Sequence, residues 1–321
     1  MKAAIATAYG SPDVIRITDV PTPVPKPNEL LIRIHASAVN AADWRLRSAN
    51  PWFVRLVFGP FKPRRAILGV VFAGEVVEIG SAVSKYKKGD RLFGWTSIMG
   101  LGGHAEYIAL PETGAFAPMP ADMSYTDAAA IPFGFGTARH FLSKAKVGKG
   151  QRVLIYGASG AVGSAAVQLA RTMGAEVTGV CSTRNMELVR SLGANEVLDY
   201  TKDDLLAKRD HYDVVFETVG MLPFKNSLKL VKPRGIIITG SEMPAQMLAR
   251  AFAGKGSKQV TVIGGTTGES ATDMQHLAEL WQRKEILAVI DQVLPLTRIV
   301  EAHALAESGR KRGNVVVTMD L

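Results

Sequence analysis

The stretch that decides the fold is Val153-Leu154-Ile155-Tyr156-Gly157-Ala158-Ser159-Gly160-Ala161-Val162-Gly163. Its apolar start predicts a buried strand, and the small residues that follow predict a Gly-rich turn opening a helix. Such a turn lets the backbone approach a pyrophosphate, to which a helix N-terminus offers N–H groups and a partial positive charge. The glycines are spaced three and three, unlike the G-x-G-x-x-G fingerprint, so the flanking strand and helix carry the prediction. The alternative is a tight turn without a ligand.

Strands and helices alternate around this stretch from about residue 122 onward. Helical spacing runs from Tyr125 to Lys146, with Pro132 as an interruption. Strands are expected at 152–156, 177–181, 197–198, 214–216, 235–239 and 260–263, and helices at 161–173, 185–192 and 271–283. Short apolar strands separated by helices are typical of a parallel sheet in a doubly wound α/β fold.

The first part of the chain is rich in Val, Ile, Pro and Gly. It shows strand-like patterns at 1–6, 30–36, 74–80 and 106–110, separated by Gly and Pro turns. Many short strands with such turns favour a β-barrel-type domain. The C-terminal tail becomes strand-like again and ends in Val315-Val316-Val317, so we expect it to return to this first domain.

The second expected strand of the α/β part indicates which dinucleotide is bound. It ends at Cys181, and Ser182-Thr183-Arg184-Asn185 follows. An NAD site usually places an acidic residue here for the ribose 2′-hydroxyl. Two hydroxyls and a guanidinium suit a 2′-phosphate instead, so NADPH is the expected cofactor. Ser182 or Thr183 also fits a plain N-cap of the next helix, and both roles are compatible.

Composition excludes several classes of protein. Of the 321 residues, 47% are apolar and 21% charged, as in an ordinary globular protein long enough for two domains. No stretch is apolar enough to span a membrane, and the N-terminus lacks a signal peptide, so a cytoplasmic location is expected. The single cysteine permits no internal disulfide. The net charge of +9 is dispersed, and no nucleic-acid partner is expected.

The phosphate loop and Ser182-Thr183-Arg184 resemble the quinone oxidoreductase-like branch of the medium-chain dehydrogenase/reductase family. Further ordered segments are similar to that family along nearly the whole chain: Tyr9-Gly10-Ser11-Pro12-Asp13-Val14, Val39-Asn40-Ala41-Ala42-Asp43-Trp44, Leu68-Gly69-Val70-Val71-Phe72-Ala73-Gly74-Glu75-Val76, Gly103-His104-Ala105-Glu106-Tyr107 and Ser308-Gly309-Arg310-Lys311-Arg312-Gly313-Asn314-Val315-Val316.

The resemblance implies a GroES-like catalytic domain of residues 1–122 completed by 266–321, a Rossmann NADP-binding domain of 123–265, and an active-site cleft between them. It implies a homodimer. For catalysis it points to Asn40 and Arg45, whose alternatives are a turn asparagine and a solvated arginine. The implied cofactor-binding residues are Asn40, Thr137, Gly157, Ala158, Ser159, Gly160, Ala161, Val162, Gly163, Ser182, Thr183, Arg184, Tyr200 and Asn314.

The chain departs from the zinc-dependent branch of this family at all three metal-ligand segments. Asn40 stands where that branch has its first Cys, Val70-Val71 replaces His-Glu, and residues 132–136 offer no second Cys. Amide and aliphatic side chains do not replace thiolate or imidazole ligands, so no metal site is expected. Zinc-free relatives often carry Asp where Val71 stands, and any acid-base role of that Asp is absent here.

Three further features have alternative interpretations. The apolar segment 51–58 fits a cover for a hydrophobic substrate, an oligomer surface or simple core. His104 and His140 are interpreted as structural, with a proton donor as the alternative, and Cys181 as a small core residue.

The resemblance predicts an enzyme that transfers a hydride from NADPH to a quinone or an α,β-unsaturated carbonyl without zinc. The alternatives are a zinc-dependent alcohol dehydrogenase, against which the missing ligands argue, and a non-catalytic NADPH-binding protein with a structural or RNA-binding role.

Overall fold

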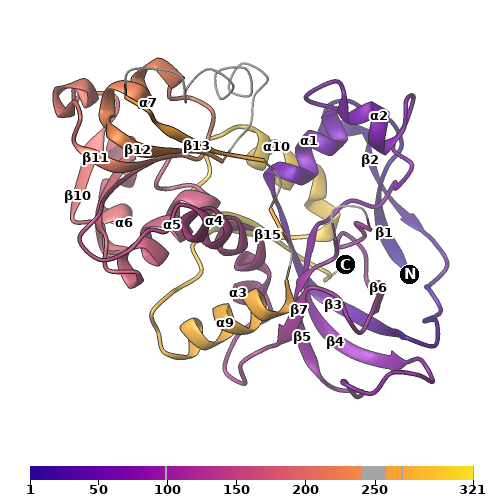
Figure 1. Ribbon diagram of the computed structural model, residues 1–321. Helices are drawn as coiled ribbons and strands as arrows, with labels where there is room; N and C mark the ends of the chain where they lie inside the picture. Colours follow the sequence, from indigo (N-terminus) through magenta and orange to yellow (C-terminus); the bar gives the residue numbers. More distant parts are fainter. Residues whose placement is uncertain (98–99, 241–257, 266, 269, 321) are drawn as a thin grey trace. The chain divides into compact units, whose positions relative to one another are not determined.

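The computed structural model covers residues 1–321, and all of them are described except 98–99, 241–257, 266, 269 and 321 (Figure 1). The chain forms two compact units. Unit 1 contains Met1–Phe133 and Glu269–Leu321, and unit 2 contains Gly134–Gly268. No helix among the described residues is both long and apolar enough to cross a membrane.

Unit 1 is built on antiparallel strands, as its turn-rich sequence predicts. The larger sheet has the order β14-β15-β3-β4-β5-β7, with β6 paired to β3, and β1 and β2 form a two-stranded sheet. Its strands are β1 (Lys2–Ala6), β2 (Ile15–Asp19), β3 (Glu29–Val39), β4 (Val71–Ile79), β5 (Arg91–Trp95), β6 (Tyr107–Pro111), β7 (Phe116–Pro118), β14 (Ile290–Pro295) and β15 (Asn314–Thr318).

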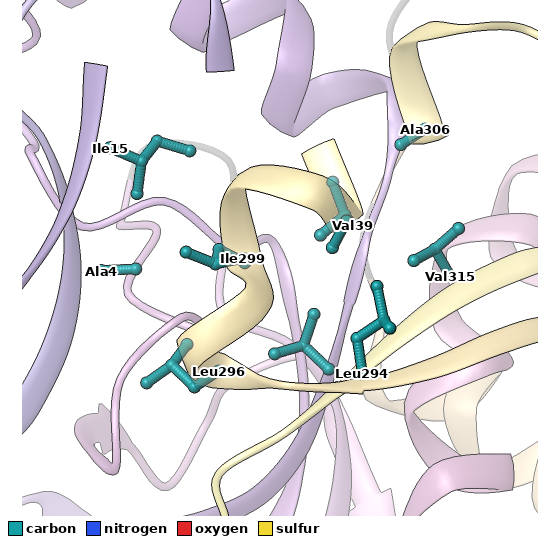
Figure 2. Packing of buried hydrophobic residues seen from close by; sticks show 10 residues of the cluster. Ala4, Ile15, Val39, Leu294, Leu296, Ile299, Ala306 and Val315 are labelled. Carbon is teal, nitrogen blue, oxygen red and sulfur yellow. The ribbon is translucent and has the colours of Figure 1, made fainter. Parts of the chain in front are cut away.

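The expected return of the C-terminal tail to this unit is confirmed. Strand β15 pairs antiparallel with β3, so that Val315 lies opposite Val39 and Val316 opposite Ala38. Helix α10 (Ile299–Glu307) precedes β15. Figure 2 shows Leu296, in the 3-10 turn before α10, and Ile299, at the start of α10, packed in one buried cluster with Ala4, Val39 and Val315. Burial of side chains of this size contributes about 1.5–3 kcal/mol each, so the tail is an integral part of the core of unit 1.

The remaining helices of unit 1 are mostly short. They are α1 (Ala41–Ser48), α2 (Val54–Phe58), α3 (Tyr125–Ala130) and α9 (Ala271–Gln282). Helices α1, α2 and α10 were not expected from the sequence. For α1 the sequence does contain a signal for a helix N-terminus, which is the spacing of Asn40 and Asp43. In the structure the Asp43 carboxylate accepts a hydrogen bond from the Asn40 N–H, as in one half of a capping box.

Unit 2 is a six-stranded parallel sheet with the order β10-β9-β8-β11-β12-β13, which is the 3-2-1-4-5-6 order of dinucleotide-binding folds. The predicted doubly wound sheet is therefore confirmed. Its strands are β8 (Arg152–Tyr156), β9 (Glu176–Cys181), β10 (Glu196–Asp199), β11 (Tyr212–Glu217), β12 (Val231–Thr239) and β13 (Thr261–Ile263). Its helices include α4 (Pro132–Lys144), which begins in unit 1, α5 (Ala161–Thr172), α6 (Met186–Ser191) and α7 (Phe224–Leu230).

Helices α4 and α5 lie close to one another at the start of α5 (Figure 1). A Cβ on Gly134 would lie 2.5 Å from the Ala161 carbonyl oxygen, so only glycine permits this approach. The order of the sheet changes direction between β8 and β11, and ligands of such sheets bind at the carboxyl ends of the strands beside that point.

Candidate functional site

The phosphate loop connects β8 to α5 in the predicted position. Gly160 is the N-cap of α5, so the N–H groups of the next three residues begin the helix without intrahelical acceptors. The loop is held to β9, because the N–H groups of Gly157 and Ala158 both donate to the Val180 carbonyl oxygen at 3.0 Å. This arrangement leaves a helix N-terminus at the carboxyl edge of the sheet, where an anion is stabilised.

Two of the loop glycines are required by close packing. A Cβ on Gly163 would lie 2.0 Å from the Gly157 carbonyl oxygen, and Gly157 itself has a φ of +82°. Gly160 differs, because a Cβ there would meet only the Gly157 carbonyl oxygen at 3.5 Å. The space beside Gly160 is therefore open, and a pyrophosphate could approach the backbone there.

Asn185 ties the phosphate loop to the end of β9. Its Nδ2 donates to Ser159 Oγ at 3.0 Å and to Ser182 Oγ at 3.3 Å. The side chain is buried, and its Oδ1 has no hydrogen-bond partner among the described residues. The sequence prediction assigned Asn185 only to the start of a helix. Its position directly after Ser182-Thr183-Arg184 was the available signal for a role at this site.

Thr183 has a hydrogen-bond partner that was not predicted from the sequence. Although no carboxylate stands in the turn directly after Cys181, the structure brings Asp199, at the end of β10, next to Thr183. The Thr183 hydroxyl donates to Asp199 Oδ2. This bond and those from Thr201 hold the pKa of Asp199 below its ordinary value. The Thr183 hydroxyl is thus already bonded to a protein acceptor, which corrects the expectation that this end of the site lacks a carboxylate.

Arg184 and Tyr200 follow neighbouring strands of the sheet. Arg184 is exposed on the turn after β9. Tyr200 follows β10, its N–H donates to the Cys181 carbonyl oxygen at 3.1 Å, and its half-exposed ring lies 6.1 Å from that of Tyr156 at the end of β8. The ends of three adjacent strands therefore carry a cation and two aromatic rings.

Two more residues bear on the cofactor-binding prediction in unit 2. Thr137 is buried on α4, one turn after Gly134, and residues three apart share a helix face. Thr137 therefore lies on the side of α4 that approaches α5. Cys181 is buried at the end of β9, and burial raises the pKa of its thiol to about 11, which agrees with a core residue.

Asn40 lies in unit 1, where β3 ends and α1 begins. Its buried Nδ2 donates to the Ala38 carbonyl oxygen at 3.1 Å, while its Oδ1 has no hydrogen-bond partner among the described residues. Because Val315 pairs with Val39, the next residues along this antiparallel ladder, Asn314 and Asn40, lie side by side. Asn314 is similar to Asn40, since its Nδ2 donates to Val289 O at 3.0 Å and its buried Oδ1 is unpartnered in the described part of the chain. Two amide oxygens thus remain available as acceptors.

Asp43 fixes the backbone around Asn40. Its Oδ2 accepts from the Asn40 N–H at 2.8 Å and its Oδ1 from the Gly69 N–H at 3.0 Å. Burial raises the pKa of Asp43 to about 7, and the backbone donors oppose this rise. The Asp43 carboxyl group thus connects its own segment, residues 39–44, to the segment 68–76. This connection was not predicted from the sequence.

Arg45 lies on α1, with its guanidinium 5.3 Å from the centre of the Trp44 ring. The Arg45 side chain is half-buried, which argues against the alternative of a fully solvated arginine. Arg45 and Asn40 belong to the same short segment of unit 1.

His104 and His303 form a buried pair in unit 1. Their rings meet edge to face with centroids 5.5 Å apart, and His104 Nε2 lies 3.5 Å from the Ala38 carbonyl oxygen. Burial lowers the pKa of His104 to about 4, and burial lowers that of His303 well below its ordinary value. Both rings are therefore neutral near pH 7, in agreement with a structural role for His104.

The residues at the expected zinc positions do not fit a metal. Val70 and Val71 are fully buried aliphatic side chains. Among the residues that the structure describes, no three His, Cys, Asp or Glu side chains gather as ligands.

Glu217 and Thr218, at the end of β11, were also missed as part of the site. Glu217 Oε1 accepts from the N–H groups of Val219 and Gly220, and Thr218 Oγ1 donates to Tyr156 O at 2.8 Å. This turn packs on Gly157 of the phosphate loop. The rule that ligands bind at the carboxyl ends of parallel strands would have pointed to it.

A GroES-like β unit in the same chain as a Rossmann sheet with a phosphate loop defines an NAD(P)-dependent oxidoreductase. The family description "Alcohol dehydrogenase GroES-like domain" matches residues 26–121, and "Zinc-binding dehydrogenase" matches residues 192–317. The chain therefore belongs to the medium-chain dehydrogenase/reductase family, in its quinone oxidoreductase-like group.

Individual relatives cover nearly the whole chain. A quinone oxidoreductase of Sus scrofa is 34% identical over 94% of this chain and 93% of its own. A chloroplastic NADPH-dependent alkenal/one oxidoreductase of Arabidopsis thaliana is 30% identical over 99% of this chain and 79% of its own. The solved quinone oxidoreductase of Coxiella burnetii superposes with a TM-score of 0.89 at 29% identity, covering 100% of this chain and 99% of its own.

Proposed function

We propose that this oxidoreductase reduces quinones or α,β-unsaturated carbonyl compounds with NADPH and without a metal ion. The observation that carries the proposal is the arrangement of the phosphate loop and the ends of β9 and β10. An open helix N-terminus lies in the same unit as Arg184 and Tyr200. The quinone and alkenal/one oxidoreductases among the relatives support the substrate class.

The cofactor preference rests on Arg184. An exposed guanidinium on the turn after β9 is suited to a 2′-phosphate, because charge-assisted hydrogen bonds are among the strong ones. The hydrogen bonds from Thr183 and Thr201 keep the pKa of Asp199 low, so this carboxylate is negatively charged and the Arg184 guanidinium has to outweigh its repulsion of the phosphate. We therefore propose NADPH over NADH, with Ser182, Thr183, Arg184 and Tyr200 near the adenosine end.

Bound NADPH supplies the hydride. The chain's own contribution is to orient the reactants and to stabilise the oxyanion that develops on the acceptor. The Oδ1 atoms of Asn40 and Asn314, which have no hydrogen-bond partner within the described ranges, are suited to the amide hydrogens of the nicotinamide. Arg45, held beside Trp44, is the cation that we assign to the acceptor oxygen. Asp43 is a positioning residue, because it acts through the Asn40 backbone.

Turnover of matched variants tests these assignments. We expect Arg45→Ala to lower kcat and kcat/KM together, about 100-fold, as for the loss of one oxyanion donor, with unchanged NADPH affinity. Arg33→Ala, which changes a strand residue of β3 exposed to solvent, is the control. A change confined to KM would make Arg45 a substrate-binding residue only. Asn40→Ala and Asn314→Ala are expected to weaken NADPH and NADH alike, because the two dinucleotides share the nicotinamide.

We further propose residues 1–122 with 266–321 as the catalytic domain and 123–265 as the NADP-binding domain, in a cytoplasmic homodimer. Strand β13 ends the six-stranded sheet, and pairing with a second copy would extend it. Light scattering at known concentration checks the dimer, and cell fractionation checks the location.

A further inference from the structure

A set of large apolar side chains in unit 1 is exposed. They lie on α2 and the turns beside it, and the exposed fraction reaches 70% for Trp52 and 90% for Phe61. We call this the aromatic surface; it consists of Trp52, Phe53, Leu56, Val57 and Phe61. The interpretation of this segment as simple core is therefore wrong, and its exposure requires another explanation, because exposed apolar clusters mark interaction sites.

The backbone that carries the aromatic surface is held in place. Tyr9 Oη donates to the Gly59 carbonyl oxygen at 2.8 Å, and the Arg64 N–H donates to Phe58 O at 2.7 Å. Gly59 is buried with a φ of +125°, and a Cβ there would lie 2.3 Å from Lys62 O. A specific turn therefore presents Phe61 to solvent.

The charged residues of the segment that carries the aromatic surface are all positive. Arg55, Lys62, Arg64 and Arg65 are exposed between or beside the apolar residues. The sequence contains no Asp or Glu from Trp44 through Gly74. The Arg55 guanidinium lies 5.1 Å from the centre of the Tyr9 ring, which fixes one of these cations at the base of the turn. The segment thus combines protruding aromatic side chains with exposed basic side chains and contains no acidic residue of its own.

We propose that the aromatic surface docks on the surface of an anionic lipid bilayer. Trp and Phe side chains partition into the interface between headgroups and acyl chains, and Arg and Lys are attracted to anionic headgroups. A fluid bilayer adapts to protruding side chains, whereas a protein partner needs a matching cavity. A symmetric contact between two copies would bring the same four cations together.

Sedimentation with lipid vesicles tests the proposal directly and does not depend on the enzyme's substrate. The 321-residue protein should bind vesicles that contain about one-third phosphatidylserine. It should bind vesicles of phosphatidylcholine alone much more weakly. Each basic side chain near an anionic surface contributes about fivefold in affinity, so Arg64→Gln with Arg65→Gln should weaken binding about 25-fold. The matched control is Lys87→Gln with Lys88→Gln, an exposed basic pair on the turn between β4 and β5.

A second pair of variants tests the apolar contribution. Trp52→Ala with Phe61→Ala should abolish most vesicle binding, whereas Met221→Ala, an exposed apolar residue of unit 2, should not. Acyl chains carrying bromine should quench the fluorescence of the wild-type protein, and Trp52→Phe should remove most of that quenching while the vesicles remain bound. Melting curves establish that each variant is folded.

Three results would overturn the proposal. One is equal binding by wild type and both surface variants. Another is the absence of binding to anionic vesicles together with loss of a dimer in the variants, which would make the surface an interface between copies. The third is a rise in KM for a water-soluble quinone without vesicle binding, which would make it a substrate cover.

Discussion

At the scale of single residues, Arg184 is the side chain that we propose selects NADPH over NADH. Its exposed guanidinium stands after β9, and the neighbouring Thr183 hydroxyl is already bonded to Asp199. A hydrogen bond to a charged group contributes about 1.5–3 kcal/mol, and about 1.4 kcal/mol corresponds to a tenfold change in affinity.

We therefore predict that Arg184→Gln weakens NADPH binding about ten- to a hundredfold and leaves NADH binding nearly unchanged. Fluorescence titration of both cofactors measures this, with Arg209→Gln, an exposed arginine after the η3 turn (Leu205–Lys208), as control. Equal weakening of both cofactors would mean that Arg184 supports the fold and does not contact the 2′-phosphate.

The residue scale also shows where sequence reasoning stops. The phosphate loop was located because its signal lies within eleven consecutive residues. The contact of Thr183 with Asp199 joins residues 16 apart, and that of Asp43 with Gly69 joins residues 26 apart. Such contacts depend on strand order and on how a loop folds back, and no local pattern encodes them.

At the scale of elements, the phosphate loop and α5 allow a matched test of fit. Gly163 touches Gly157, so Gly163→Ala must displace the backbone. Such overpacking costs about 1–3 kcal/mol of unfolding free energy. Gly160 faces open space, so Gly160→Ala should change stability by less than about 0.5 kcal/mol.

The same pair separates folding from binding. We predict that Gly160→Ala keeps the unfolding free energy but loses at least about tenfold in affinity for NADPH and NADH, because its methyl group occupies the space for the pyrophosphate. Urea denaturation and cofactor titration of both variants measure this. If Gly160→Ala binds both cofactors like wild type, the pyrophosphate does not approach the loop at that point.

Helices α1 and α10 of unit 1 share a buried polar cluster, from which we expect a dependence of stability on pH. Arg47 of α1 is fully buried and pairs with Glu307 of α10 at 2.5 Å, and His303 of α10 lies beside Arg47 and His104. The two histidines have lowered pKa values, so they give stability that is present above about pH 6.5 and lost as pH falls. Asp43 has a raised pKa of about 7, so its effect is opposite and stability falls as pH rises toward 7.

Between pH 5 and 6 the unfolded chain therefore binds about one more proton than the folded cluster, which corresponds to about 1.4 kcal/mol of unfolding free energy per pH unit. We predict that His303→Leu lowers the pH slope of the unfolding free energy by this amount. Urea denaturation across this range measures it, and His276→Gln on α9 serves as control. An unchanged slope in His303→Leu would mean that His303 is protonated in the folded protein.

The elements themselves were predicted unevenly. The strands of unit 2 followed from apolar runs with flanking turns, and the return of β15 followed from its terminal valines. Helix α10 was missed because its composition, Ile299-Val300-Glu301-Ala302-His303-Ala304-Leu305-Ala306-Glu307, is apolar on most sides and lacks a polar cap. Its position is decided by packing against Ala4, Val39 and Val315.

At the scale of the whole molecule, the proposed roles are divided between the two units. Unit 2 holds the phosphate loop and the cation proposed for the 2′-phosphate, and unit 1 holds Asn40, Arg45 and Asn314. The chain has no thiolate or imidazole at the positions where the zinc-dependent branch binds its metal. An alcohol substrate needs a means of stabilising an alkoxide, which a metal supplies as a Lewis acid. In a conjugated acceptor, the arriving charge spreads over an enolate or hydroquinone, so hydrogen-bond donors and one cation suffice.

The central claim is tested most directly by steady-state turnover of chelator-treated protein with NADPH and a panel of quinones, enones and enals, beside oxidation of simple alcohols with NADP⁺. We expect reduction of at least one class of conjugated acceptor at a rate that the chelator does not change, and little or no alcohol oxidation. The opposite result would contradict this function: rapid alcohol oxidation and no turnover of any conjugated acceptor. In that case the chelator would remove about one zinc per chain together with the alcohol oxidation, and added zinc would restore it.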